Sequence, residues 1–73
     1  MATTTTKEQA MKNLIEEAVA ADIAAADALA THSWTPAHSI RYERAILALM
    51  QATGNSKAVT ENYVEGLVVK VAA

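Results

Sequence analysis

Apolar residues recur at helical spacing along most of this 73-residue chain, and the pattern predicts three helices. The first runs from Lys7 to about Ala30, contains no glycine or proline, and is rich in alanine, the strongest helix former. Thr6 and Gln9 match the capping-box pattern of a helix N-terminus, so we expect residues 1–5 to fray. One face of this helix carries the apolar side chains Met11, Leu14, Ile15, Ala18, Ala25, Ala26 and Leu29.

A second helix is predicted over residues 36–53. Thr35 is a favourable N-cap, Pro36 suits the first helical position because its missing amide would be unpaired there, and Gly54 supplies a stop. The apolar surface of this helix is broad enough to contact two neighbours. It consists of Tyr42, Ala45, Ile46, Leu49, Met50 and Thr53, with Ile40 and Leu47 at its edge.

A third helix is predicted over residues 57–70, with Asn55 or Ser56 as its cap. Gly66 and several valines disfavour a helix here, and a strand over 67–71 is the alternative, but no other segment offers that strand a sheet to join. We therefore predict helix. Two apolar stripes run side by side along it: Val59, Tyr63, Leu67 and Val71, and next to them Thr60, Val64 and Val68.

The short connections between these elements favour antiparallel neighbours, so the predicted fold is all-α, a single antiparallel three-helix bundle with a long alanine-rich first helix. A domain of 73 residues has a marginal core, and the absence of cysteine removes disulfides as a source of stability. The first helix is also too long for the other two to cover. We therefore expect a helical homo-oligomer, with an interface formed by Leu14, Ala18, Asp22, Ala25 and Leu29.

Asp22 is an anomaly, because it falls in the centre of the apolar face of the first helix, where an unpaired carboxylate is costly. One interpretation leaves it partly hydrated among alanines, or paired with Arg41, Arg44 or the Trp34 ring N–H. The other makes it a polar contact that sets the register of an oligomer interface.

Net charge and hydropathy limit the classes of partner that we expect. Six Lys and Arg residues against eight Asp and Glu give a formal net charge of −2, which offers no bulk attraction to nucleic acid or to an anionic membrane. No apolar run approaches the roughly 20 residues of a membrane span, and residues 1–9 lack the apolar centre of a signal peptide. The sequence therefore predicts a cytoplasmic protein without a membrane partner.

The sequence offers little to support catalysis or metal binding. His32 and His38 are six residues apart, which is not the spacing that presents two imidazoles to one metal ion from a helix, and no carboxylate flanks them. Ser33 and Ser39 lie near these histidines, but without the strand-turn-helix elbow that activates a serine. We predict no metal, no cofactor and no enzymatic activity.

The start of the predicted second helix carries the widest range of functional groups in the chain. Trp, Tyr and Arg are enriched at protein interfaces, whereas a helix N-terminus with arginines nearby can hold a phosphate or carboxylate while a tryptophan stacks on a base. A third interpretation folds the tryptophan back onto the first turns and leaves the arginines solvated or paired with Glu43 and Glu16. The candidate contact residues are Trp34, His38, Arg41, Tyr42 and Arg44.

Residues 48–64 resemble the helix-turn-helix of bacterial repressors over about 20 residues. Gly54, Ser56 and Val64 fit that pattern, but Asn55 and Thr60 stand where the family has apolar residues. The resemblance implies a DNA-binding regulator. The helix that follows the turn, here the predicted third helix, would then enter the major groove.

The charges of the third helix weaken this DNA-binding alternative. Glu61 and Glu65 would face phosphates unfavourably, and only Lys57 and Lys70 would attract them. We therefore predict a non-catalytic protein-protein interaction module, such as a small regulator, inhibitor or assembly adaptor that covers a partner surface. The alternatives are the helix-turn-helix DNA-binding regulator and a binder of small anions or nucleotides at the start of the second helix.

Overall fold

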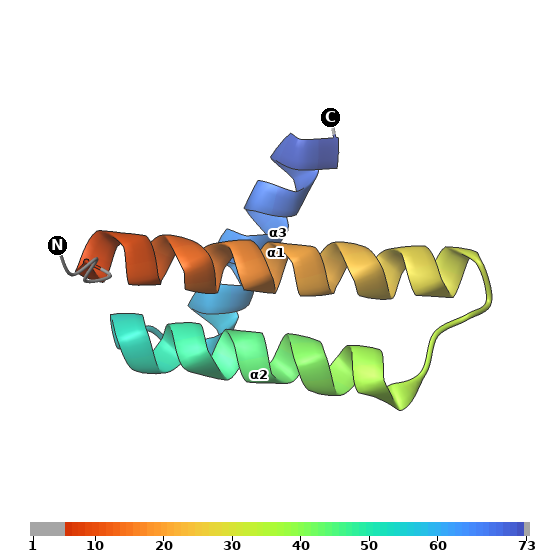
Figure 1. The fold of residues 1–73 in the computed structure, drawn as a ribbon, viewed down its shortest axis with the longest axis horizontal. Helices are drawn as coiled ribbons and strands as arrows, with labels where there is room; N and C mark the ends of the chain where they lie inside the picture. The colour runs from red at the N-terminus through yellow and green to blue at the C-terminus, as the bar shows by residue number, and fades with distance from the viewer. Residues whose placement is uncertain (1–5, 73) are drawn as a thin grey trace, which may run out of the picture.

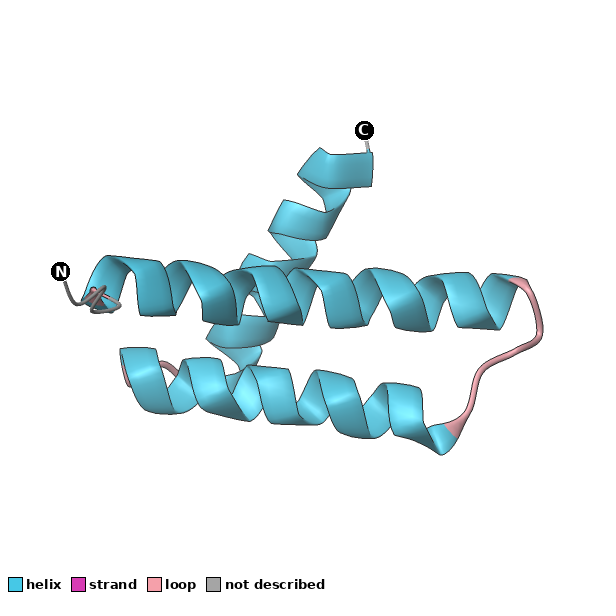
Figure 2. Ribbon diagram, in the orientation of Figure 1, coloured by secondary structure: helices cyan, strands magenta, loops and turns pink. Residues whose placement is uncertain are grey.

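The computed structural model describes residues 6–72 and shows three α-helices and, within that range, no strand (Figure 2). The predicted all-α fold with three helices is confirmed. The third helix continues through residues 67–71, so the strand alternative is wrong, while the expectation for residues 1–5 lies outside the described part of the chain. The helices are α1 (Lys7–Ala30), α2 (Pro36–Thr53) and α3 (Lys57–Ala72).

The start of α1 is capped as predicted, but only by half of the capping box. The Thr6 hydroxyl oxygen accepts a hydrogen bond from the Gln9 backbone N–H at 3.0 Å. The Gln9 side chain does not return the bond; its amide instead donates to the Asn13 side chain at 2.9 Å, one turn along the helix. The Thr6 cap still satisfies one of the free amides at the helix start.

The end of α1 is closed by a residue with a left-handed backbone. His32 has φ of 59°, its N–H donates to the Leu29 carbonyl at 3.3 Å, and the Ser33 N–H donates to the Ala28 carbonyl at 2.8 Å. This pair of bonds is the Schellman motif, in which glycine is the usual occupant of the left-handed position. His32 is therefore a structural residue at a helix end, held in a conformation that a side chain disfavours.

The ends of α2 are also set by local contacts. His38 lies in the first turn, and its ring Nδ1 lies 3.1 Å from both the backbone nitrogen and the hydroxyl oxygen of Thr35, so that the ring caps the start of the helix. At the other end Gly54 has φ of 75°, and its N–H donates to the Met50 carbonyl at 2.8 Å. The next helix is capped by Ser56, whose hydroxyl accepts from the N–H three residues on at 3.3 Å.

The first two helices run alongside each other in opposite directions, and α3 crosses both of them steeply (Figure 1). The C-terminal end of α3 projects beyond α1 in this view, so only part of its length can lie against the pair. None of the three helices, within residues 6–72, is both long and apolar enough to cross a membrane.

The core forms where α3 crosses the pair. Ile46 of α2 and Val64 of α3 are the largest fully buried side chains, and Leu49 is 2% exposed. Thr60 is also buried, and its hydroxyl donates to the Ser56 carbonyl at 2.8 Å, which satisfies a polar group that would otherwise be costly there. Met11, Leu14, Ile15, Val19, Tyr42, Met50 and Val68 pack around this centre.

The structure corrects the predicted apolar face of α1 and selects one of the two stripes named for α3. In the second half of α1 the chain buries Ala21 and Ala28, whereas Leu29, which we expected on the apolar face, is 62% exposed, and Ala26 is exposed as well. In α3 the buried stripe is the one through Thr60 and Val64. The neighbouring stripe leaves Val59, Tyr63 and Val71 more than half exposed.

Candidate functional site

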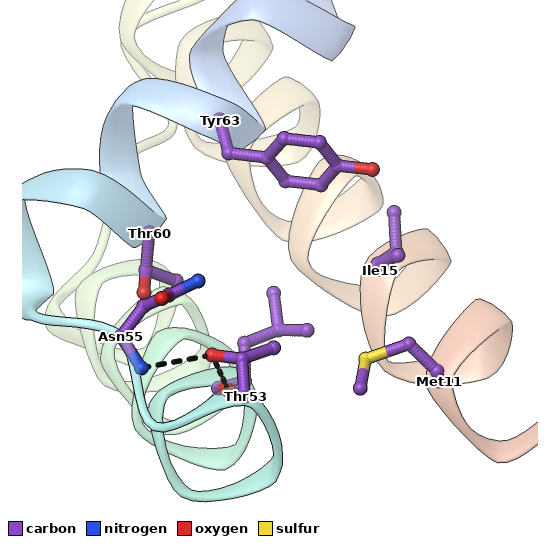
Figure 3. Close-up of a pocket in the computed structure, with 7 residues that line it drawn as sticks. Met11, Ile15, Thr53, Asn55, Thr60 and Tyr63 are labelled. Atoms are coloured by element: carbon purple, nitrogen blue, oxygen red, sulfur yellow. Dashed lines mark hydrogen bonds between the residues drawn. The ribbon is translucent and has the colours of Figure 1, made fainter. Parts of the chain in front are cut away.

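Two hollows in the surface, on different sides of the α3 crossing, are candidate contact sites. The first, which we call the apolar groove, has a volume of about 240 Å³ and lies between α1 and the turn that joins α2 to α3 (Figure 3). Tyr63 and Met11 extend toward the space from opposite sides in that view. The groove is lined by Met11, Ile15, Leu49, Thr53, Asn55, Thr60 and Tyr63.

The polar groups at the floor of the apolar groove are occupied. The Thr53 hydroxyl donates to the Leu49 carbonyl at 2.8 Å, and its oxygen accepts from the Asn55 backbone N–H at 3.2 Å (Figure 3). A groove with a satisfied Thr53 hydroxyl and with walls of Met, Ile, Leu and Tyr offers a ligand mainly apolar surface.

The second hollow, the acidic-aromatic cleft, has a volume of about 280 Å³ and lies where the start of α2 meets α1 and α3. It brings together three of the five predicted contact residues, namely Trp34, His38 and Tyr42. Carboxylates from two other helices face the same space, and sequence reasoning did not place them there. The full lining is Asp22, Ala25, Trp34, His38, Ser39, Tyr42, Glu61 and Glu65.

The two predicted arginines lie outside this cleft. Arg41 donates two hydrogen bonds to the Glu17 carboxylate of α1, at 2.8 and 3.0 Å, and both side chains are about half exposed. These hydrogen bonds, with the opposite charges adding to them, lower the pKa of Glu17 and raise that of Arg41. Arg44 is exposed on another part of α2, near Leu47 and outside the cleft.

Glu43, which we considered as an arginine partner, instead pairs with Lys57 of α3 at 3.2 Å. The structure therefore divides the predicted cluster in two. The aromatic residues and His38 line the cleft together with three carboxylates, and the arginines are held or exposed elsewhere. A negatively charged ligand would meet carboxylates in this cleft and no arginine.

The pKa of Tyr42 reports the electrostatic character of the cleft. Burial is the largest cause that raises it, and the negative charges of Glu61, Asp22, Glu65 and Glu43 follow, so that the pKa reaches about 12. A phenolate is disfavoured at this position both because water is excluded and because carboxylates lie on several sides of the ring.

The residues predicted to form an oligomer interface do not share one free surface. Ala18 is fully buried in the chain's own core, and Leu14 packs against that core. Asp22 and Ala25 line the acidic-aromatic cleft and are partly buried, so the interpretation of Asp22 as partly hydrated matches its place in the structure. Leu29 is the member of the set that is largely exposed. A homo-oligomer stays a prediction.

The α2-turn-α3 segment contains the left-handed Gly54 and the Ser56 cap that the helix-turn-helix resemblance requires. Thr60, which departs from the repressor pattern, nevertheless occupies the buried position, and Val59 is 53% exposed. Glu61 and Glu65 face the cleft, and the ammonium of Lys57 is already paired. The DNA-binding alternative therefore lacks free cations at the start of α3.

The chain has no match among protein-family models, curated proteins or solved structures. Its function must therefore be argued from its own surface.

Proposed function

We propose that the protein is a non-catalytic interaction protein that works by covering a surface of a partner protein. One observation carries this proposal: large apolar side chains stay exposed on all three helices, while four of the seven buried apolar residues are alanines. Apolar side chains that gather into an exposed patch mark a contact surface on a small protein, and we take these residues as candidates for one. The exposed residues are Leu29, Trp34, Ile40, Leu47, Val59, Tyr63, Val69 and Val71.

The apolar groove is the best-formed part of that surface. It combines exposed Tyr63 with side chains that belong to the core, so a partner residue inserted there would extend the core. Tyrosine is favoured at such positions because its ring is large and rigid and its hydroxyl tolerates water. Such a contact would suit a small regulator, inhibitor or assembly adaptor, and a second copy of the chain is one partner that could make it.

Affinity capture from the source cells, after chemical cross-linking, tests this proposal. We expect wild type and Asn62→Ala to recover the same partner, and Tyr63→Ala to lose most of it. Asn62 is exposed on the same helix next to Tyr63, so it controls for changes in α3 itself. Equal recovery with all three proteins would exclude the groove as the contact. A strictly monomeric protein that captures nothing above a tag-only control would refute the interaction role.

DNA binding is the second candidate, and the Gly54 turn is the observation in its favour. Binding that depends on phosphate contacts should be strongest at low salt. We expect no mobility shift with random duplex DNA at low salt, because Lys57 is paired and the next two charged residues on α3, Glu61 and Glu65, are acidic. A salt-sensitive shift that Lys70→Gln weakens would instead support the helix-turn-helix alternative.

A further inference from the structure

In the described part of the chain, three carboxylates without an ion pair line the acidic-aromatic cleft together. Glu17 and Glu43 each have a cation within 4 Å, at 2.8 and 3.2 Å. Asp22, Glu61 and Glu65 have no ion pair and no side-chain hydrogen bond anywhere in residues 6–72. The fold thus gathers like charges from α1 and α3 around one concave surface and leaves them without a cation.

The geometry of the cleft favours a large organic cation over a metal ion. Within the described residues, no three His, Cys, Asp or Glu side chains are grouped closely enough to hold a metal. The cleft also has aromatic walls, Trp34 and Tyr42, and Trp34 is 41% exposed and so accessible to a ligand. Aromatic faces attract cations, and they attract them most strongly where water is partly excluded.

No group of the cleft supplies a fixed positive charge of its own. His38 is the one lining residue that can become cationic, and its Nδ1 is held at the cap of α2 by contacts with Thr35. The raised pKa of Tyr42, caused by burial and by carboxylates from all three helices, agrees with a negative potential in this space.

We propose that the acidic-aromatic cleft binds an arginine side chain of the partner protein, stacked on Trp34 and paired with Glu61 or Glu65. Arginine fits better than lysine because its planar guanidinium can stack on an aromatic ring and pair with a carboxylate through two hydrogen bonds at once. The inference deepens the proposed function, on which it rests, by stating the chemistry of the partner at a second contact site.

Trp34 is the only tryptophan, so its fluorescence reports the cleft directly. We would titrate the full chain with a capped pentapeptide that has arginine between glycines, and with the same peptide carrying citrulline, which keeps the shape but not the charge. We expect a saturable change with the arginine peptide and binding about tenfold weaker with citrulline. Equal responses to the two peptides would overturn the proposal.

The protein side of the test uses two double variants with the same change in net charge. Glu61→Gln with Glu65→Gln should weaken binding of the arginine peptide by about tenfold. Glu8→Gln with Glu16→Gln, which alters exposed carboxylates of α1 outside the cleft, should weaken it by no more than about twofold. Equal weakening by both would show a general charge effect and refute a specific site. Circular dichroism checks that each variant keeps its helices.

Failure of this inference is distinguishable from failure of the proposed function. If the captured partner is lost with Tyr63→Ala but kept with the Glu61 and Glu65 double variant, the interaction role stands and the arginine site falls. If both variants release the same partner, both contacts belong to one interface, and the partner segment that reaches the cleft should contain an arginine. An arginine-free contact segment, identified by cross-linking to this cleft, would overturn the proposal.

Discussion

The steep crossing of α3 makes Val64 the side chain on which its docking depends most. Val64→Ala removes two buried methyl-sized groups, each contributing about 0.8 kcal/mol. The remaining cavity adds about 1 kcal/mol, because a helix interface closes only partly around it. Alanine is a better helix former and returns about 0.5 kcal/mol. The expected net loss is about 2 kcal/mol of the free energy of unfolding.

That loss is a large part of the total, since a domain of this length has a stability of about 4 to 11 kcal/mol. It corresponds to a fall in Tm of roughly 10 °C. Urea unfolding followed by circular dichroism measures it directly. Val69→Ala is the matched control, because Val69 is 66% exposed on the same helix and loses little packing, so its stability should stay within about 0.5 kcal/mol of wild type.

The comparison also has a refuting outcome. If Val69→Ala destabilised the protein as much as Val64→Ala, the outer face of α3 would be buried in solution, and the crossing of Figure 1 would not describe its packing. A loss with Val69→Ala that grows as the protein is concentrated would specifically indicate self-association through that face.

Three further predictions concern backbone conformation and titration. His32→Gly should raise the free energy of unfolding by roughly 0.5 to 1 kcal/mol in thermal or urea unfolding, because it relieves the left-handed backbone, and His32→Ala should show no such gain. Gly66→Ala should add roughly 0.5 to 1 kcal/mol, because a Cβ there meets nothing within 4 Å, whereas Gly54→Ala should lose about 1 kcal/mol at its positive φ. The third prediction uses Tyr63→Phe, which leaves Tyr42 as the only tyrosine, and absorbance titration of this variant should place the pKa of Tyr42 at about 12. Because the unfolded value is about 10, the contribution of Tyr42 to stability is present below pH 10 and is lost as the pH rises toward 12. A midpoint near 10 would contradict the burial and the negative charges described for this cleft.

The helix ends were predictable from the sequence because each depends on residues within one turn. The Thr6 bond to Gln9 and the Gly54 stop require no knowledge of the rest of the fold. His32 could not be predicted in this way, because in the sequence it looks like an ordinary loop residue. Only the structure shows that the amides of His32 and Ser33 donate to carbonyls of α1.

The buried faces were less predictable, because they depend on which neighbours arrive. A strict 100° projection of α1 puts Leu29 in the apolar face, but the buried positions Ala18, Ala21 and Ala28 are spaced by three and seven residues, which is a repeat of 3.5 rather than 3.6 residues per turn. In α3, the sequence pattern named two neighbouring stripes and did not decide between them. The stripe through Thr60 can be buried because the Thr60 hydroxyl donates to the carbonyl of Ser56, the residue that caps the helix.

The candidate site could be predicted only in part. Trp34, His38 and Tyr42 do share a surface, as their closeness in sequence suggested. The two arginines lie outside that surface, and Arg41 instead pairs with a carboxylate 24 residues earlier in the chain. The 61–65 spacing of the α3 glutamates puts both on one face of that helix, but only the crossing angle of α3 decides that the face is opposite Trp34.

The same crossing accounts for both candidate surfaces. A third helix aligned with α1 and α2 would lay a full apolar stripe into the groove between them and cover Val59 and Tyr63. Because α3 crosses instead, it contacts the pair mainly through Thr60, Val64 and Val68, which leaves an apolar groove on one side and a carboxylate-lined cleft on the other. The isolated chain bears exposed apolar area and unpaired like charges as a result. Docking of the partner that we propose, with an apolar side chain in the groove and a cation in the cleft, would relieve both at once.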